Sequence, residues 1–254
     1  MAQYETGRPR PDEASLDRDD GRPPVRIALH PIAPPVTLGL WGFFASTMVV
    51  STWLLGWWGN DASAQYFFEI AAVFGGLAQF LAGLWSFRAR DYIASALLTM
   101  WGTYWMSYGF MVALGTAGVL TIPKLDEPFP AFGVWFIPLG LFTCWGAIAA
   151  LRENLPLFFL LGTVGSGCGA VAAGFWIGSP HWIGIGAWLF IFGAGWAWYV
   201  GSMAMLESAW GRVILPIGVV PGLSKHPVAA NVPGRRISQP AAYALGQPGV
   251  RHGQ

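Results

Sequence analysis

The chain has 254 residues, of which 54% are hydrophobic and only 11% are charged, whereas soluble domains average about 25% charged residues. Eleven of the charged residues lie in residues 1–36, and only eleven more are spread over residues 37–210. A water-soluble protein cannot cover its surface with such a core. The composition therefore excludes an ordinary soluble enzyme, a nucleic-acid binder and a disordered chain, and it indicates an integral membrane protein.

Six apolar segments are long enough to cross a bilayer as helices, which takes about 20 residues each. They lie at residues 37–58, 66–87, 92–114, 131–151, 155–177 and 182–206. The sequence thus predicts an all-α membrane protein, a compact bundle of six transmembrane helices. We expect this transport core over residues 37–218, with flexible polar tails at residues 1–36 and 219–254.

The basic residues predict the orientation of the bundle. With six spans, both tails and the connections at residues 88–91 and 152–154 share one side, and they hold 13 of the 14 Lys and Arg residues. The other side holds only Lys124. Because short cytoplasmic segments carry the excess of Lys and Arg, we expect both termini in the cytoplasm of a multi-pass plasma-membrane protein.

The deep polar groups of the spans are neutral, and no Lys or Arg lies at the centre of a span. Neutral hydroxyls and amides replace part of the hydration shell of a small ion without holding the ion tightly, which suits conduction. The candidate pathway residues of this kind are Thr47, Gln79, Thr103 and Thr163. The alternative for each hydroxyl is a hydrogen bond to the carbonyl one turn back.

Glu69 is a candidate proton carrier, because an ionised carboxylate one turn inside a span is costly unless it is wet or paired. The alternative is that Glu69 lies at the outer water boundary. The spans contain no carboxylate pair, His cluster or Ser/His arrangement. We therefore predict no enzyme activity, no metal and no cofactor.

Four segments resemble, in order, motifs of the acetate uptake transporter family, also called the succinate–acetate permeases. The segments are TLGLWGF at residues 37–43, GGLAQ with AGLW at residues 75–85, GTYWMSY at residues 102–108 and WGRVILPIG at residues 210–218. The resemblance implies a six-helix protomer that assembles as a homo-hexamer. It also implies transport of acetate and related small monocarboxylates, in some members succinate, in a channel-like or proton-coupled manner.

The family narrows its pathway with a hydrophobic Phe, Tyr and Leu triad. By resemblance Phe43 takes the Phe position, Trp101 takes the Tyr position, and the Leu position falls at Thr163–Val164, which makes Val164 the third constriction residue. This chain departs from the family at Pro34, where the family has Asn, and at Trp101. Two alternatives stay open: a non-transporting membrane scaffold or sensor with a blocked pathway, and a transporter of ammonium or another small neutral solute.

Overall fold

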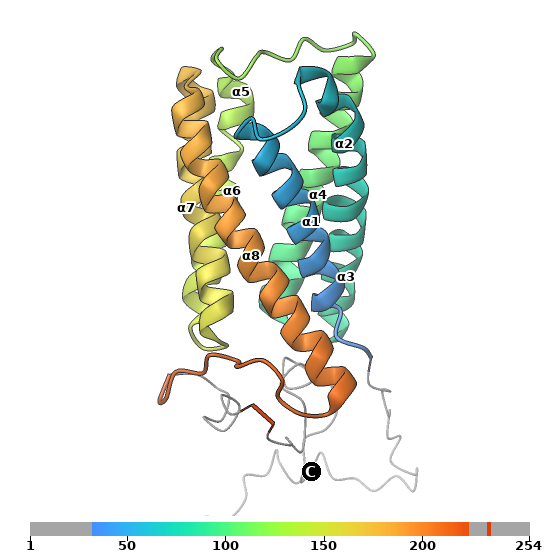
Figure 1. Ribbon diagram of the computed structural model, residues 1–254, viewed down its shortest axis with the longest axis vertical. Coiled ribbons are helices and arrows are strands. Elements are labelled where there is room, and N and C mark those ends of the chain that lie inside the picture. Colours follow the sequence, from blue (N-terminus) through green and yellow to red (C-terminus); the bar gives the residue numbers. More distant parts are fainter. Residues whose placement is uncertain (1–31, 224–232, 235–254) are drawn as a thin grey trace, which may run out of the picture. The chain divides into compact units, whose positions relative to one another are not determined.

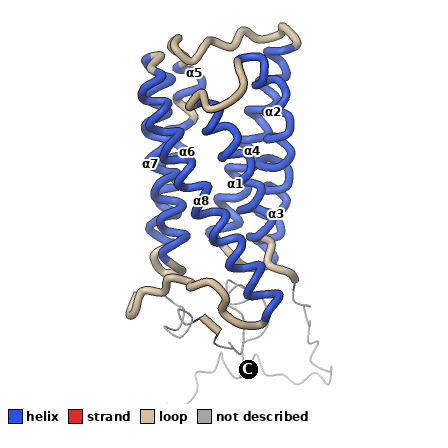
Figure 2. The backbone as a smooth tube through the Cα atoms, viewed as in Figure 1, coloured by secondary structure: helices blue, strands red, loops and turns tan. Residues whose placement is uncertain are grey.

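The computed structural model describes residues 32–223 and 233–234. Most of both predicted tails therefore lies outside the described residues. The described part of the chain is helical and holds no strand (Figures 1 and 2). Its helices are α1 (Val36–Leu54), η1 (Asp61–Ser63), α2 (Ala64–Ala71), η2 (Ala72–Ala78), α3 (Gln79–Arg88), α4 (Tyr92–Thr116), α5 (Pro130–Gly133), α6 (Phe136–Ala150), α7 (Leu155–Ile177) and α8 (Pro180–Trp210).

These elements make six rods of membrane length. The elements α2, η2 and α3 run on as one rod, Ala64–Arg88, and α5 and α6 form another, Pro130–Ala150. Together with α1, α7 and α8, these rods are long and apolar enough to cross a membrane. The sixth rod, α4, has 25 residues but carries more Ser, Thr and Tyr. It lies beside α3 in the same bundle (Figure 1), which confirms the predicted six-helix all-α architecture.

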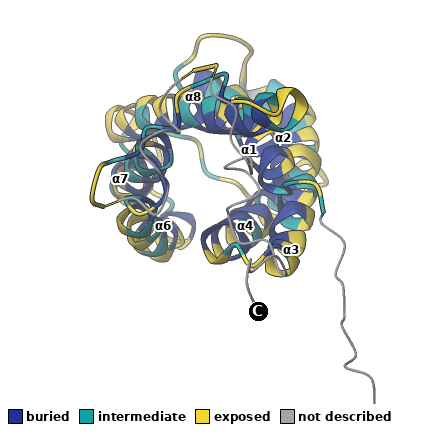
Figure 3. Ribbon diagram, turned by 90° about the horizontal axis from the view of Figure 1, so that it is seen from below, coloured by how far each residue is buried: buried dark blue, intermediate teal, exposed yellow. Residues whose placement is uncertain are grey.

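Seen along its axis, the bundle is a ring of helices (Figure 3). The helix α8 packs on α1 and α7, α7 packs on α6, and α3 packs on α4, whereas α4 and α6 contact each other much less closely. At one end, which we call the tail end, α1 begins and α8 ends. At the other, the loop end, residues 117–129 connect α4 to α5 (Figure 1).

Local sequence signals set the short connections at the tail end. The side chain of Asp91 accepts a hydrogen bond from the Ala94 backbone N–H (2.9 Å) and caps the start of α4. The side chain of Asn154 does the same for α7 through the Leu157 N–H (2.9 Å). Because each cap satisfies a backbone donor that the helix leaves open, the chain can turn within a few residues and re-enter the bundle.

A π-helical segment, η2, interrupts the second rod at Ala72–Ala78. Its wider turn brings the carbonyl of Phe74 against Gly42 of α1, where a side chain would collide with that oxygen. Short π segments occur often at functional sites, since the extra residue per turn redirects the side chains around it. The segment holds α1 close to the second rod at mid-height of the bundle.

Replacing Gly102 with alanine should destabilise the bundle. The added Cβ would lie 2.7 Å from the Phe80 nitrogen and 2.9 Å from the Gly76 oxygen, and these backbone atoms cannot rotate away. We expect a loss of about 1–3 kcal/mol, measured as a lower midpoint of thermal unfolding in detergent. In the control Gly169→Ala the Cβ meets nothing within 4 Å, so its midpoint should hold or rise. An equal drop in both variants would contradict the packing argument.

Candidate functional site

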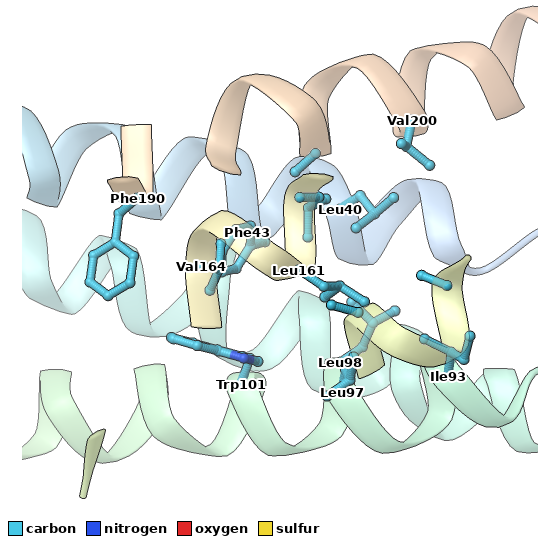
Figure 4. Close-up of a cluster of buried hydrophobic side chains, with 14 of the residues drawn as sticks. Leu40, Phe43, Ile93, Leu97, Leu98, Trp101, Leu161, Val164, Phe190 and Val200 are labelled. Atoms are coloured by element: carbon cyan, nitrogen blue, oxygen red, sulfur yellow. The ribbon is translucent and has the colours of Figure 1, made fainter. Parts of the chain in front are cut away.

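Three side chains from three helices meet inside the ring. Phe43 of α1, Trp101 of α4 and Val164 of α7 lie together in the bundle interior (Figure 4), and all three are at most 4% exposed. The rings of Phe43 and Trp101 meet edge to face, with their centroids 5.6 Å apart. We call these three residues the apolar layer. The structure thus brings together the residues that the resemblance assigns to a constriction; their role in transport stays a prediction.

Aliphatic side chains continue the apolar layer toward the tail end. They come from positions three or four residues earlier on the same helices, which is one helical turn. These residues are Leu40, Leu97, Leu98 and Leu161 (Figure 4). The barrier is therefore about two turns thick, and a hydrated ion cannot cross it unless the side chains move or the ion sheds water.

The polar atom of Trp101 is already paired. Its indole Nε1–H donates to the Oγ1 of Thr143 on α6 (3.0 Å), and the Thr143 hydroxyl donates in turn to the Leu139 carbonyl (2.6 Å). Thr143 is fully buried. This bond fixes the indole with its ring toward Phe43, and it links α4 to α6, the pair of neighbours that otherwise contact each other little.

A wide vestibule opens at the loop end. It has a volume of about 620 Å³, and its charged lining residues are Lys124 and Asp126. Between the vestibule and the apolar layer lies a small chamber of about 20 Å³, which shares the residues Tyr108, Phe132 and Phe175 with the vestibule. The complete lining of the chamber is Thr47, Val50, Ser51, Leu54, Trp101, Tyr104, Trp105, Tyr108, Phe132, Phe136, Val171, Phe175 and Phe190.

A third cavity, of about 50 Å³, lies on the tail-end side of the apolar layer. Aliphatic side chains line most of it, with Asp91, Glu153 and Asn154 among the rest. Vestibule, chamber, apolar layer and tail-end cavity thus follow one another along the bundle axis. The only described interruption between the cavities is apolar, so opening the layer would join the two ends.

Most intramembrane hydroxyls donate to the carbonyl one turn back, as the alternative interpretation expects. Those that do so are Thr52, Ser86, Ser95, Thr99, Thr103, Ser107, Thr116, Thr143, Thr163 and Ser166. Of the predicted pathway hydroxyls, Thr103 lines a side groove between α4 and α6 of about 400 Å³, and Thr163 lies against Gly193 of α8. Thr47 alone among them lines the chamber.

Gln79 and Glu69 line none of the four cavities described above. Gln79 is 2% exposed, and its Oε1 has no hydrogen-bond partner. One carboxylate oxygen of Glu69, Oε2, is also buried without a partner. Neither residue is among the lining residues of the vestibule, the chamber, the side groove or the tail-end cavity. Their roles in transport stay predictions.

The aromatic wall of the chamber was not predicted from the sequence. Tyr104, Trp105 and Tyr108 follow Trp101 on α4 at intervals of three, four and seven residues, so all four share one helix face. This spacing was the signal in the sequence that could have predicted the aromatic wall.

The residues that the structure describes contain no cluster of His, Cys, Asp and Glu that could hold a metal ion.

The six membrane-length helices form a ring around cavities, and the apolar layer divides these cavities. Such an architecture is suited to the passage of small solutes through a membrane. Residues 22–221 match the GPR1/FUN34/yaaH family, and the chain belongs to that family. It resembles a solved structure of the bacterial acetate channel SatP with a TM-score of 0.66 at 23% identity, covering 74% of this chain and 100% of the other. Family membership, together with the helices that are long and apolar enough to cross a membrane, identifies the chain as an integral membrane protein.

Three relatives show the range within the family. The succinate-acetate/proton symporter SatP of Escherichia coli K12 is 26% identical over 193 residues, which is 74% of this chain and 96% of the relative. Acetate permease A of Emericella nidulans is 26% identical over 53% of this chain and 46% of the relative. Ammonia transport outward protein 2 of Saccharomyces cerevisiae is 28% identical over 52% of this chain and 48% of the relative.

Replacing Thr143 with valine should leave the Trp101 indole N–H buried without an acceptor. We expect a stability loss of about 1–3 kcal/mol and a changed indole ¹⁵N–¹H resonance for Trp101, measured by thermal unfolding and NMR. The matched control Thr143→Ser keeps the hydroxyl and should retain the resonance. Equal losses for valine and serine would show that packing, and not the hydrogen bond, holds the indole.

Proposed function

We propose that this protein passes acetate and related small monocarboxylates across a membrane, along the axis of the bundle and through the apolar layer. The observation that carries the proposal is the contact between Phe43 and Trp101, which separates the chamber from the tail-end cavity. Family membership supports the class of solute, because two relatives are named for acetate.

The chemistry of the path favours a small monoanion. Its lining is mainly aromatic and aliphatic, and the basic side chain in the described cavities is Lys124 at the mouth of the vestibule. A solute must therefore shed much of its water at the apolar layer, which costs more for two charges than for one. Acetate carries one charge and one methyl group, so part of its surface suits the layer. Succinate, with two charges, should pass more slowly.

We also propose that both termini face the cytoplasm and that the protein assembles as a homo-hexamer in the plasma membrane. Arg88, Arg90, Arg152 and Arg212 lie at or just after the tail-end termini of α3, α6 and α8, and Lys124 lies in the loop-end connection at residues 117–129. This asymmetry supports a cytoplasmic tail end. The vestibule then faces outward, and solute enters from the loop end. The hexamer rests on the family resemblance.

A second candidate function is passage of ammonia or ammonium, since one relative is named an ammonia transport outward protein. A third is a scaffold or sensor whose closed apolar layer never opens. Uptake of labelled acetate and of ammonium into proteoliposomes separates the three. Acetate uptake that propionate inhibits and ammonium does not supports the monocarboxylate proposal, and uptake of ammonium alone supports the second candidate. A fully assembled protein that passes neither solute supports the scaffold.

Replacing Trp101 with alanine should open the apolar layer. Loss of the indole removes both the ring contact to Phe43 and the hydrogen bond to Thr143, so we expect faster acetate flux and a relatively larger gain for propionate and succinate. The measurement is initial uptake of the three labelled solutes into proteoliposomes. Unchanged fluxes of all three in Trp101→Ala would remove Trp101 from the barrier.

The proton-carrier hypothesis for Glu69 is tested by Glu69→Gln. If Glu69 carries the coupled proton, an imposed inward proton gradient should accelerate acetate uptake several-fold in the wild type and not in the variant. Gln79→Glu is not a suitable control, because Gln79 is buried in the bundle. Glu127→Gln in the loop is suitable, because Glu127 is exposed and lines none of the four cavities, and it should keep the response to the gradient. A full response in Glu69→Gln would end the hypothesis.

A further inference from the structure

After α8 the chain runs back across the tail end of the bundle. Residues 211–220, which we call the strap, form no helix and follow α8 in orange at that end (Figure 1). Gly211 ends α8 in the left-handed conformation (φ 61°), which glycine adopts without strain. Pro216 cannot supply a backbone donor for a further helical turn. The sequence WGRVILPIG at residues 210–218 therefore ends a span and begins the strap.

Alternate residues of the strap are directed into the bundle. Val213 and Ile217 are each only 1% exposed, whereas Arg212 and Pro216 are exposed. This two-residue period is that of an extended chain, whose side chains point to opposite faces in turn. The inward residues, which are buried or packed against the core, are Val213, Leu215, Ile217 and Val219. The strap thus presents an apolar face to the bundle and an exposed face to the tail-end side.

Ile217 is the residue of the strap that lines the tail-end cavity. It shares this cavity of about 50 Å³ with Leu40 and Leu161, which continue the apolar layer, and all three belong to one buried hydrophobic cluster. The strap lies at the level where α7 begins, because the Leu155 N–H donates to the Gly218 carbonyl (2.9 Å). A solute that leaves the apolar layer toward the tail end therefore enters a cavity that the strap bounds on its outer side.

Contacts to the ends and sides of the helices hold the strap in place. The Leu155 N–H of α7 donates to the Gly218 carbonyl, and the Tyr199 hydroxyl of α8 donates to the Pro216 carbonyl (2.8 Å). Gly218 has a φ of 72°, and a Cβ there would lie 2.7 Å from the Pro156 Cδ, so glycine lets the strap lie against α7. These hydrogen bonds are not part of the internal bonding of a helix. The strap can therefore leave without unwinding α7 or α8, and such segments open locally at a lower free energy than packed helices do.

We propose that the strap is a second barrier on the path, which closes the tail-end cavity with Ile217 and must move away before a solute can leave the bundle. The inference rests on the proposed function and adds to it a gate that lies outside the helices. The apolar layer and the strap act in series, so the path conducts when both are open. The layer opens by movement of side chains within the ring, whereas the strap opens by movement of its backbone away from the ring.

Movement of the strap is tested by thiol accessibility, which requires no transport. Ile217→Cys is made in the whole protein with Cys144→Ala, and the buried Cys168 of α7 stays as an internal reference. A charged methanethiosulfonate reagent is applied in detergent, and mass spectrometry follows each thiol. We expect the thiol introduced by Ile217→Cys to react about tenfold faster than Cys168, because the strap opens more easily than the core. Val219→Cys, which leaves the Ile217 side chain in place, should behave in the same way. Rates as slow as that of Cys168 in both variants would overturn the inference.

Removal of a contact that holds the strap should speed its opening. Tyr199→Phe keeps the ring contact to Trp196 but loses the hydrogen bond to the Pro216 carbonyl. Modification of the thiol introduced by Ile217→Cys should then be roughly 2- to 10-fold faster. The matched control Tyr66→Phe, at an exposed tyrosine of the loop end, should leave the rate unchanged. An unchanged rate in Tyr199→Phe would mean that the reagent reaches the thiol without movement of the strap, and would overturn the inference.

Locking the strap tests its place in transport. Tyr199→Cys and Pro216→Cys are combined in a chain whose own cysteines, Cys144 and Cys168, are replaced by alanine, and a bifunctional methanethiosulfonate reagent joins the two introduced thiols. Labelled acetate flux into proteoliposomes should fall several-fold on crosslinking and recover after reduction. Each single variant should keep its own flux when it is treated with the same reagent.

The two measurements separate failure of the strap from failure of the proposed function. If the thiol introduced by Ile217→Cys reacts faster than Cys168 but the wild type passes no acetate, the movement of the strap stands and the proposed transport fails. If the crosslinked variant passes acetate as fast as it does after reduction, transport stands and the second barrier is wrong.

Discussion

The edge-to-face contact between Phe43 and Trp101 is the constraint on which the rest of the structure depends. It fills the centre of the helix ring, with the chamber on its loop-end side and the tail-end cavity on the other. The contact holds because the indole is tied to Thr143 across the loosest junction in the ring. One hydrogen bond thus positions the barrier and also joins α4 to α6. A movement of one of these helices relative to the other would therefore displace the Trp101 indole in the apolar layer.

Chemistry changes in steps along the axis. The vestibule carries charged groups, the chamber is lined mainly by aromatic and aliphatic side chains, and the apolar layer offers no donor, since the Trp101 N–H is already paired. At each step toward the apolar layer, fewer groups of the protein can take the place of the water molecules around an anion. A solute that holds its charge at one end and a methyl at the other meets this gradient at the lowest cost. On the proposed function, the arrangement selects solutes by the cost of their desolvation.

The fold was predictable from the sequence, because residues 37–210 carry few charges and form long apolar segments. In a membrane, such segments can satisfy their backbone hydrogen bonds as helices. It predicted the meeting of Phe43, Trp101 and Val164 through the family resemblance. It could not predict which hydroxyls are free, because Thr47 and Thr163 look alike in sequence and differ only in what faces them. The same holds for Trp105, whose indole N–H is buried without a hydrogen-bond partner.

Accessibility of position 43 tests most directly whether the solute crosses at the apolar layer. Phe43→Cys is made in a chain whose own cysteines, Cys144 and Cys168, are replaced by alanine, and a small thiol reagent is applied during labelled acetate uptake into proteoliposomes. If acetate passes between Phe43 and Trp101, the reagent should stop the flux, and excess acetate should slow the modification. Complete modification of the thiol introduced by Phe43→Cys, with unchanged acetate flux, would contradict passage through this layer.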